Sequence, residues 1–136
     1  MTLLEPLYTS DYYKVEVDFR NSLLRTEWLR SVTEDEFMAG GTKLKQLVEA
    51  HNITKVLANA QQLRTITPKT KDWLSNAFYE ELSQLNISKL ARVMPPDLFS
   101  RIALESVITR AEAIGHINFL VKNFPDDQEA LDWLRA

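Results

Sequence analysis

Three short apolar segments, separated from one another by helical patterns, constrain the fold of this chain more than any other feature. They are residues 56–58, 90–94 and 117–121. Each is too short for a helix and favours a strand, and residues 56–58, which include no polar side chain, are typical of a strand that is covered on both faces. Because a helical pattern separates each segment from the next, we expect right-handed crossovers and parallel strands.

Two further strands are expected before these segments. Residues 12–19 alternate between apolar and charged side chains, and residues 23–29 repeat the alternation after a short polar break. Such a pair is typical of an antiparallel hairpin with one buried face. The chain is therefore predicted to form an α/β (α+β) domain with a mixed five-stranded sheet.

Helix starts are marked by side chains that satisfy free backbone N–H groups. Thr33 and Glu36 form a capping-box pattern, Thr67 precedes a proline at the first helical position, and Asp97 and Asp126 are further caps. The predicted order is ββαβαβαβα, with helices packed on the sheet. We expect residues 1–136 to form a single domain, in which residues 1–10 are a loosely ordered N-terminal segment.

The composition excludes several classes of function. The chain has 136 residues, a formal net charge of −3 and no cysteine, so disulfides, thiolate metal sites and cysteine nucleophiles are absent. Nucleic acid is not an expected partner, because phosphate backbones attract clustered Lys and Arg. With no basic and apolar leader and no long apolar run, we expect a cytoplasmic protein that does not insert into membranes.

The order of elements and several local motifs resemble the STAS-like domains, in particular a bacterial branch of that superfamily. The motifs are Glu27-Trp28, the strand at residues 56–60, Thr67-Pro68 before Trp73, and the acidic residues 126–129 before Leu131-Asp132-Trp133-Leu134. Its relatives include anti-sigma-factor antagonists and, more distantly in fold, CRAL-TRIO lipid-transfer domains. The resemblance extends from Tyr12 to the C-terminus and implies a regulatory module that docks protein partners.

In the anti-sigma-factor antagonists, a Ser or Thr at the start of the helix after the central strand is phosphorylated. The resemblance makes Thr65 and Thr67 the phosphoacceptor candidates here, although no Asp-x-Ser motif occurs. A helix N-terminus favours a phosphate through its dipole and free N–H groups. Thr67 also fits the plain role of an N-cap.

No pattern in the chain predicts catalysis, a metal or a cofactor. His51 and His116 follow predicted helix ends, where an imidazolium is stabilised by the helix dipole. Gly40 and Gly41 lie inside a predicted helix rather than in a phosphate loop, which favours close helix–sheet packing or a weak point in that helix. The acidic clusters at residues 34–36 and 126–129 are accounted for by capping. We therefore expect a non-enzymatic protein.

The helix from residue 97 to 114 carries more apolar side chains than one buried stripe requires. This surplus predicts contact with a neighbouring helix, a second subunit or an apolar ligand. Its candidate interface or pocket residues are Leu98, Phe99, Ile102, Leu104 and Ile108. The first hypothesis is a protein-interaction module that forms a homodimer. The alternative is a carrier or sensor of a small apolar or amphipathic, lipid-like ligand held between sheet and helices.

Overall fold

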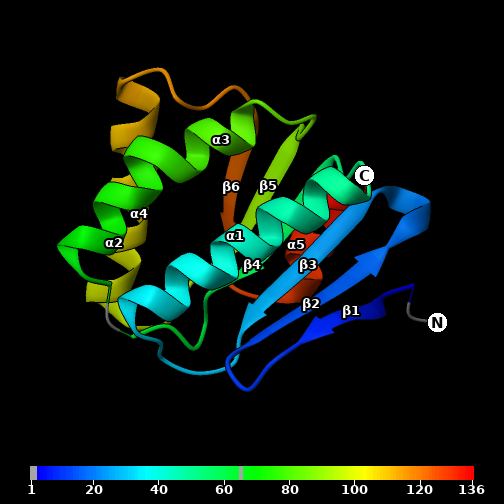
Figure 1. Ribbon diagram of the computed structural model, residues 1–136, viewed down its shortest axis with the longest axis horizontal. Helices are drawn as coiled ribbons and strands as arrows, with labels where there is room; N and C mark the ends of the chain where they lie inside the picture. The colour runs from blue at the N-terminus through cyan, green and yellow to red at the C-terminus, as the bar shows by residue number, and fades with distance from the viewer. Residues whose placement is uncertain (1–2, 65) are drawn as a thin grey trace.

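One mixed six-stranded sheet forms the centre of the protein, as a computed structural model describes it for residues 3–64 and 66–136 (Figure 1). The strands follow one another across the sheet in chain order. The first three are antiparallel, and the third to the sixth are parallel. They are β1 (Glu5–Thr9), β2 (Tyr13–Asp18), β3 (Leu23–Trp28), β4 (Lys55–Asn59), β5 (Lys89–Val93) and β6 (Leu120–Phe124).

The helices cover the two faces of the sheet unequally. When parallel strands are added in one direction, right-handed crossovers put every connecting helix on the same face. Figure 1 accordingly shows α1, α2, α3 and α4 in front of the sheet and α5 behind it. The helices are α1 (Glu34–Ala50), α2 (Pro68–Trp73), which continues through the π-helical turn η2 (Leu74–Phe78) into α3 (Tyr79–Ser83), α4 (Leu98–Ala113) and α5 (Asp127–Arg135).

The α/β class and the mixed sheet are confirmed, but the predicted number of strands is wrong. The additional strand is β1, within the ten N-terminal residues expected to be loosely ordered. It forms an edge of the sheet, where Pro6 is tolerated because one side of an edge strand needs no N–H donor. Its register also shifts between Pro6 and Tyr8, so the regular alternation that marks a strand is interrupted.

The last strand begins three residues later than predicted. Residues 117–119 precede the sheet: Ile117 and Phe119 pack into the core under the helices, and the Asn118 side chain donates to the Ser83 carbonyl oxygen at 2.8 Å. The chain joins the sheet at Leu120, which is paired with Lys89. Apolar character alone does not separate residues that pack under helices from residues that pair in a sheet.

All four predicted helix caps are confirmed. The Thr33 hydroxyl accepts from the Glu36 N–H at 3.1 Å while the Glu36 carboxylate accepts from the Thr33 N–H at 3.0 Å, which completes a capping box. Thr67, Asp97 and Asp126 accept in the same way from N–H groups three residues further on. These contacts are local, so the sequence is sufficient to locate them.

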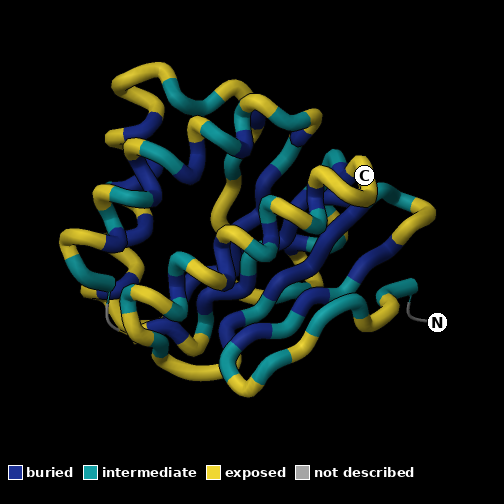
Figure 2. Tube along the Cα trace, in the orientation of Figure 1, coloured by how far each residue is buried: buried dark blue, intermediate teal, exposed yellow. Residues whose placement is uncertain are grey.

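Two separate apolar cores lie on the two faces of the sheet. Figure 2 shows that buried residues are concentrated in the central strands. The larger core lies between the sheet and α1 to α4. It includes a series of contacting aromatic rings, in which Trp28 stacks on Phe37 with ring centroids 4.8 Å apart. The smaller one lies under α5 and consists of Leu23, Leu57, Ala91, Val93, Phe124, Ala130 and Leu134. The larger core, under α1 to α4, therefore contains most of the buried apolar residues.

Gly40 and Gly41 allow α1 to approach this aromatic series closely. A Cβ atom on Gly40 would lie 2.5 Å from the Trp28 ring, and one on Gly41 would lie 2.6 Å from the Trp73 ring. Real Cβ contacts are never this short, so a larger residue requires the indole or the helix to move. The predicted close packing of these glycines is confirmed.

We expect Gly40→Ala to lower the free energy of unfolding by about 1 to 2 kcal/mol, because overpacking outweighs the gain in helix propensity. Urea denaturation measures this change. Thr42→Ala, at an exposed position of the same helix, is the control and leaves the stability nearly unchanged. A more stable Gly40→Ala variant would contradict the close approach of Trp28.

An ion pair joins the C-terminal end of α5 to the β2–β3 hairpin. The carboxylate of Asp18, which is 1% exposed, accepts from both nitrogens of Asn21 and from Arg135 Nη2 at 3.2 Å. Burial by itself opposes ionisation, but the hydrogen bonds from Asn21 and Arg135 outweigh it and hold the pKa of Asp18 below its ordinary value.

A carboxyl whose pKa is lower in the folded state stabilises the fold above its unfolded pKa of about 3.9 and loses that effect as the pH falls. We therefore expect Asp18→Asn to be less stable than the wild type at pH 7. The difference should shrink once the pH falls below about 4. Urea denaturation at a series of pH values, with the exposed Asp132→Asn as control, tests this; a difference that does not vary with pH would contradict it.

Candidate functional site

A cleft of about 850 Å³ lies at the carboxyl ends of the parallel strands β4, β5 and β6. Open α/β sheets bind ligands and partners at this edge, because the loops that follow the strands leave a crevice there. Three loops and the first turns of α4 form its walls. The lining residues are Gln61, Gln62, Arg64, Met94, Pro95, Pro96, Leu98, Arg101, Ile102, Glu105, Asn123, Phe124 and Pro125.

The polar groups of the cleft come mostly from short loops. Arg64 Nη1 donates to the Gln61 carbonyl oxygen at 2.6 Å and holds the loop after β4 in a turn. The Ser100 N–H, with which Asp97 caps α4, lowers the pKa of Asp97, and the charges of Arg64 and Arg101 act in the same direction. The wall at the start of α4 therefore carries two cations beside one carboxylate.

An exposed apolar patch borders the cleft. Leu98, Phe99 and Ile102, in the first two turns of α4, are 55%, 82% and 52% exposed. We call these three residues the α4 patch. Leu98 and Ile102 also line the cleft, whereas Phe99 projects beside it. Adjacent exposed apolar side chains at a cleft are characteristic of interaction sites.

The five candidate residues of this helix divide into two groups. Leu98, Phe99 and Ile102 form the exposed α4 patch, but Leu104 and Ile108 are 5% and 8% exposed and belong to the core. The reason is the position of α4 on the sheet, which buries one side of the helix and exposes its first two turns on the other. Only the fold distinguishes these groups, because all five positions are equally apolar in sequence.

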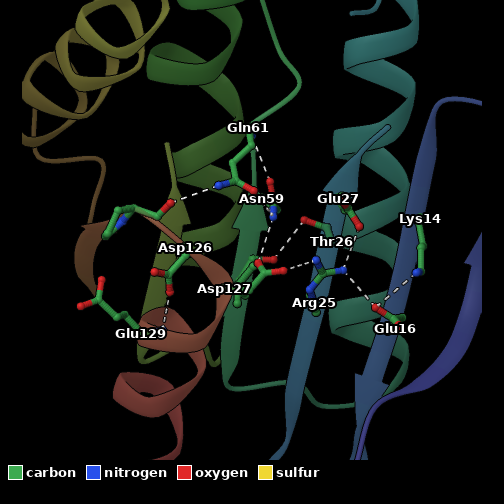
Figure 3. Close-up of polar contacts among 12 residues, drawn as sticks. Lys14, Glu16, Arg25, Thr26, Glu27, Asn59, Gln61, Asp126, Asp127 and Glu129 are labelled. Carbon is green, nitrogen blue, oxygen red and sulfur yellow. Dashed lines mark hydrogen bonds and ion pairs between the residues drawn. The ribbon is translucent and has the colours of Figure 1, made fainter. Parts of the chain in front are cut away.

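A second polar cluster lies behind the sheet, where α5 begins (Figure 3). Arg25, on β3, pairs with Glu16 at 3.0 Å, with Glu27 at 3.1 Å and with Asp127 in the first turn of α5. Asn59, at the end of β4, donates to the other oxygen of Asp127 at 2.9 Å. The cluster thus joins three strands to the N-terminus of α5.

The pairing within this cluster indicates a structural role. Burial disfavours the Arg25 cation, but hydrogen bonds and charges from Asp127 and Glu27 outweigh it and raise the pKa of Arg25. Each carboxylate that contacts Arg25 therefore works as its counterion. The alternation of residues 23–29 puts Arg25 and Glu27 on one side of the hairpin. No sequence pattern indicates that α5 covers that side.

We expect Arg25→Met to lower the free energy of unfolding by about 2 to 3 kcal/mol, since it leaves three carboxylates around the α5 start without their cation. Urea denaturation measures the loss, and Arg20→Met, at an exposed position outside the proposed interface, is the control. Hydrogen exchange should accelerate most in α5. A variant as stable as the wild type, with unchanged exchange in α5, would contradict this role.

Of the two phosphoacceptor candidates, the structure describes Thr67, which lies at the start of α2. The Thr67 hydroxyl donates to the Glu34 carboxylate and accepts from the Thr70 N–H at 3.2 Å. Thr67 therefore caps α2 and ties it to the first turn of α1, and a phosphate there would meet the charge of Glu34. Thr65 lies outside the described residues.

The remaining candidates are dispersed over the molecule. His51 caps the end of α1 and contacts Phe19, whereas His116 contacts the Ser75 carbonyl oxygen and Glu80. Among residues 3–64 and 66–136, no three His, Asp or Glu side chains are grouped to hold a metal ion.

Comparison with known proteins found no match: no family model matches the chain, and neither does any curated protein. No helix in the described part of the chain is long and apolar enough to cross a membrane. The site is therefore interpreted from its own geometry.

Proposed function

We propose that this protein is a non-enzymatic interaction module of the STAS-like type that self-associates through the α4 patch and the adjoining cleft. The observation that carries the proposal is the exposure of Leu98, Phe99 and Ile102 side by side at the carboxyl edge of the sheet. Exposed apolar side chains of this size gain free energy when a partner removes them from water.

A projecting side chain beside a hollow supports a second copy of the chain as the partner. In a two-fold dimer both copies use the same surface patch. A side chain that projects from the patch of one copy must therefore fit a hollow in the same patch of the other copy. Phe99 projects directly beside the cleft, which Leu98 and Ile102 line. Two copies exchange Phe99 reciprocally, each ring entering the cleft of the other copy.

The charges beside the patch also support self-association. Arg101 and Glu105 lie four residues apart, on the same face of α4 as Ile102, and within the described residues neither forms an ion pair. When two α4 helices pack antiparallel across a two-fold axis, Arg101 of each copy meets Glu105 of the other. The surface is therefore complementary to itself in charge as well as in shape.

Analytical ultracentrifugation over a concentration series tests this interface. We expect a dimer, and we expect Phe99→Asp to raise its Kd at least about thirtyfold, because central aromatic residues dominate binding energy. Leu120→Asp, at a residue that is 63% exposed on β6, is the matched control and leaves the Kd unchanged. A monomeric wild type at every concentration would overturn self-association and leave this surface to a different protein.

A charge exchange distinguishes the antiparallel helix pair from other contacts. Arg101→Glu and Glu105→Arg should each weaken the dimer, because each places like charges opposite one another. The double variant should restore much of the lost affinity. Failure of the double variant to recover would contradict the antiparallel arrangement of α4, provided that circular dichroism shows all three variants to be folded.

A further inference from the structure

Arg92 is a buried cation for which the described residues supply no anion. It lies on β5 with 4% of its surface exposed. Its side chain lies on the face of the sheet that α1 to α4 cover, opposite the face that α5 covers. Its Nε donates to Asn123 Oδ1 at 3.0 Å and its Nη1 donates to the Leu104 carbonyl oxygen at 2.7 Å. Both acceptors are neutral.

Arg25 provides a direct comparison within the same sheet. Arg25 and Arg92 are the two buried arginines among residues 3–64 and 66–136. Arg25 contacts three carboxylates, whereas Arg92 contacts none. A buried charge without a counterion is costly, because neutral hydrogen bonds replace only part of its hydration. Arg92 therefore lacks the carboxylate counterions that Arg25 has.

A cavity of about 60 Å³ adjoins Arg92 between the sheet and the helices. Within the described part of the chain, Arg92 Nη2 makes no hydrogen bond, and Arg92 is one of the residues that line the cavity. The other walls are mainly aromatic and aliphatic, among them Trp28, Phe37 and Tyr79. The cavity thus combines one cationic group with apolar walls.

The helix that covers this cavity is irregular at that point. The π-helical turn η2 contributes Leu74 and Phe78 to the wall, and Tyr79 follows directly. A π-helical turn is a rare distortion that occurs frequently at functional sites. The π-helical turn over the cavity therefore indicates a functional site there independently of the charge of Arg92.

We infer that this cavity binds the carboxylate of a small organic acid, with Arg92 as its counterion. A water molecule accounts for about 30 Å³ of liquid, so the space suits a group of about the size of acetate. The planar fork of a guanidinium matches the two oxygens of a carboxylate. The apolar walls accommodate a short hydrocarbon remainder better than they accommodate a phosphate, which needs more donors.

This site does not depend on the proposed dimer, because the cavity lies within the core of one chain. Thermal unfolding with acetate or propionate tests it against sodium chloride of equal ionic strength and against the neutral amide of each acid. We expect at least one acid to raise Tm by about 3 °C or more at saturating concentration, and the amides to have no such effect.

Arg92→Met removes the charge while retaining much of the side-chain volume. The variant should lose the carboxylate-dependent rise in Tm, whereas Arg101→Met, at the exposed cleft, should retain it. An equal rise in the Arg92→Met variant would mean that the acids act on the protein surface, and it would overturn the site. The absence of any rise in the wild type would overturn it as well.

A second measurement on the wild type decides the matter if Arg92→Met does not fold. The Nε–Hε signal of Arg92 in a nitrogen-15 NMR spectrum should move on titration with the acid that raises Tm, together with the backbone signals of the π-helical turn Leu74–Phe78. Signals that move only at Arg64 and Arg101 would assign the acid to the cleft and overturn the proposal.

Discussion

Right-handed connection between neighbouring parallel strands is the constraint on which the rest of the structure depends. Because β3 to β6 are added to the sheet in chain order, each right-handed crossover returns over the same face. The helices α1 to α4 therefore share one side and enclose the larger core. The opposite face is left to the helix that follows the last strand, and α5 is the C-terminal element that covers it (Figure 1).

This asymmetry explains why charged side chains hold α5 in place. The apolar core beneath α5 is small, and polar contacts close it at both ends. Asp127 pairs with Arg25 where the helix begins, and Arg135 pairs with Asp18 where it ends. The helix therefore depends on a cluster at each end as well as on the apolar residues between them.

The same arrangement leaves the carboxyl edge of the sheet open. The loops after β4 and β5 turn away toward the helices, and the chain after β6 turns behind the sheet into α5, so a cleft remains between them. One side of the first two turns of α4 faces away from the core at this edge, which exposes Leu98, Phe99 and Ile102. The surface that we propose for self-association is therefore a consequence of strand order. The unpaired Arg92 lies deeper, in the core beneath the helices.

The features with local causes could be predicted from the amino-acid sequence. Thr33, Thr67, Asp97 and Asp126 mark helix starts because each cap contacts an N–H group only three residues away. The alternation of residues 12–19 and the short apolar segments likewise give the α/β class and the mixed sheet. Gly40 and Gly41 were correctly related to close packing, although their tryptophan neighbours could not be named.

Tertiary structure alone decided which side chains of the same kind are buried, paired or exposed. Phe99 and Leu104 are both apolar residues of α4, and only the position of the helix on the sheet exposes one and buries the other. The edge strand β1 and the start of β6 depend on pairing with strands distant in sequence, which leaves no local signal. Arg25 and Arg92 are likewise both arginines on strands. Only the fold gives one its carboxylates and places the other, with neutral partners, beside a cavity.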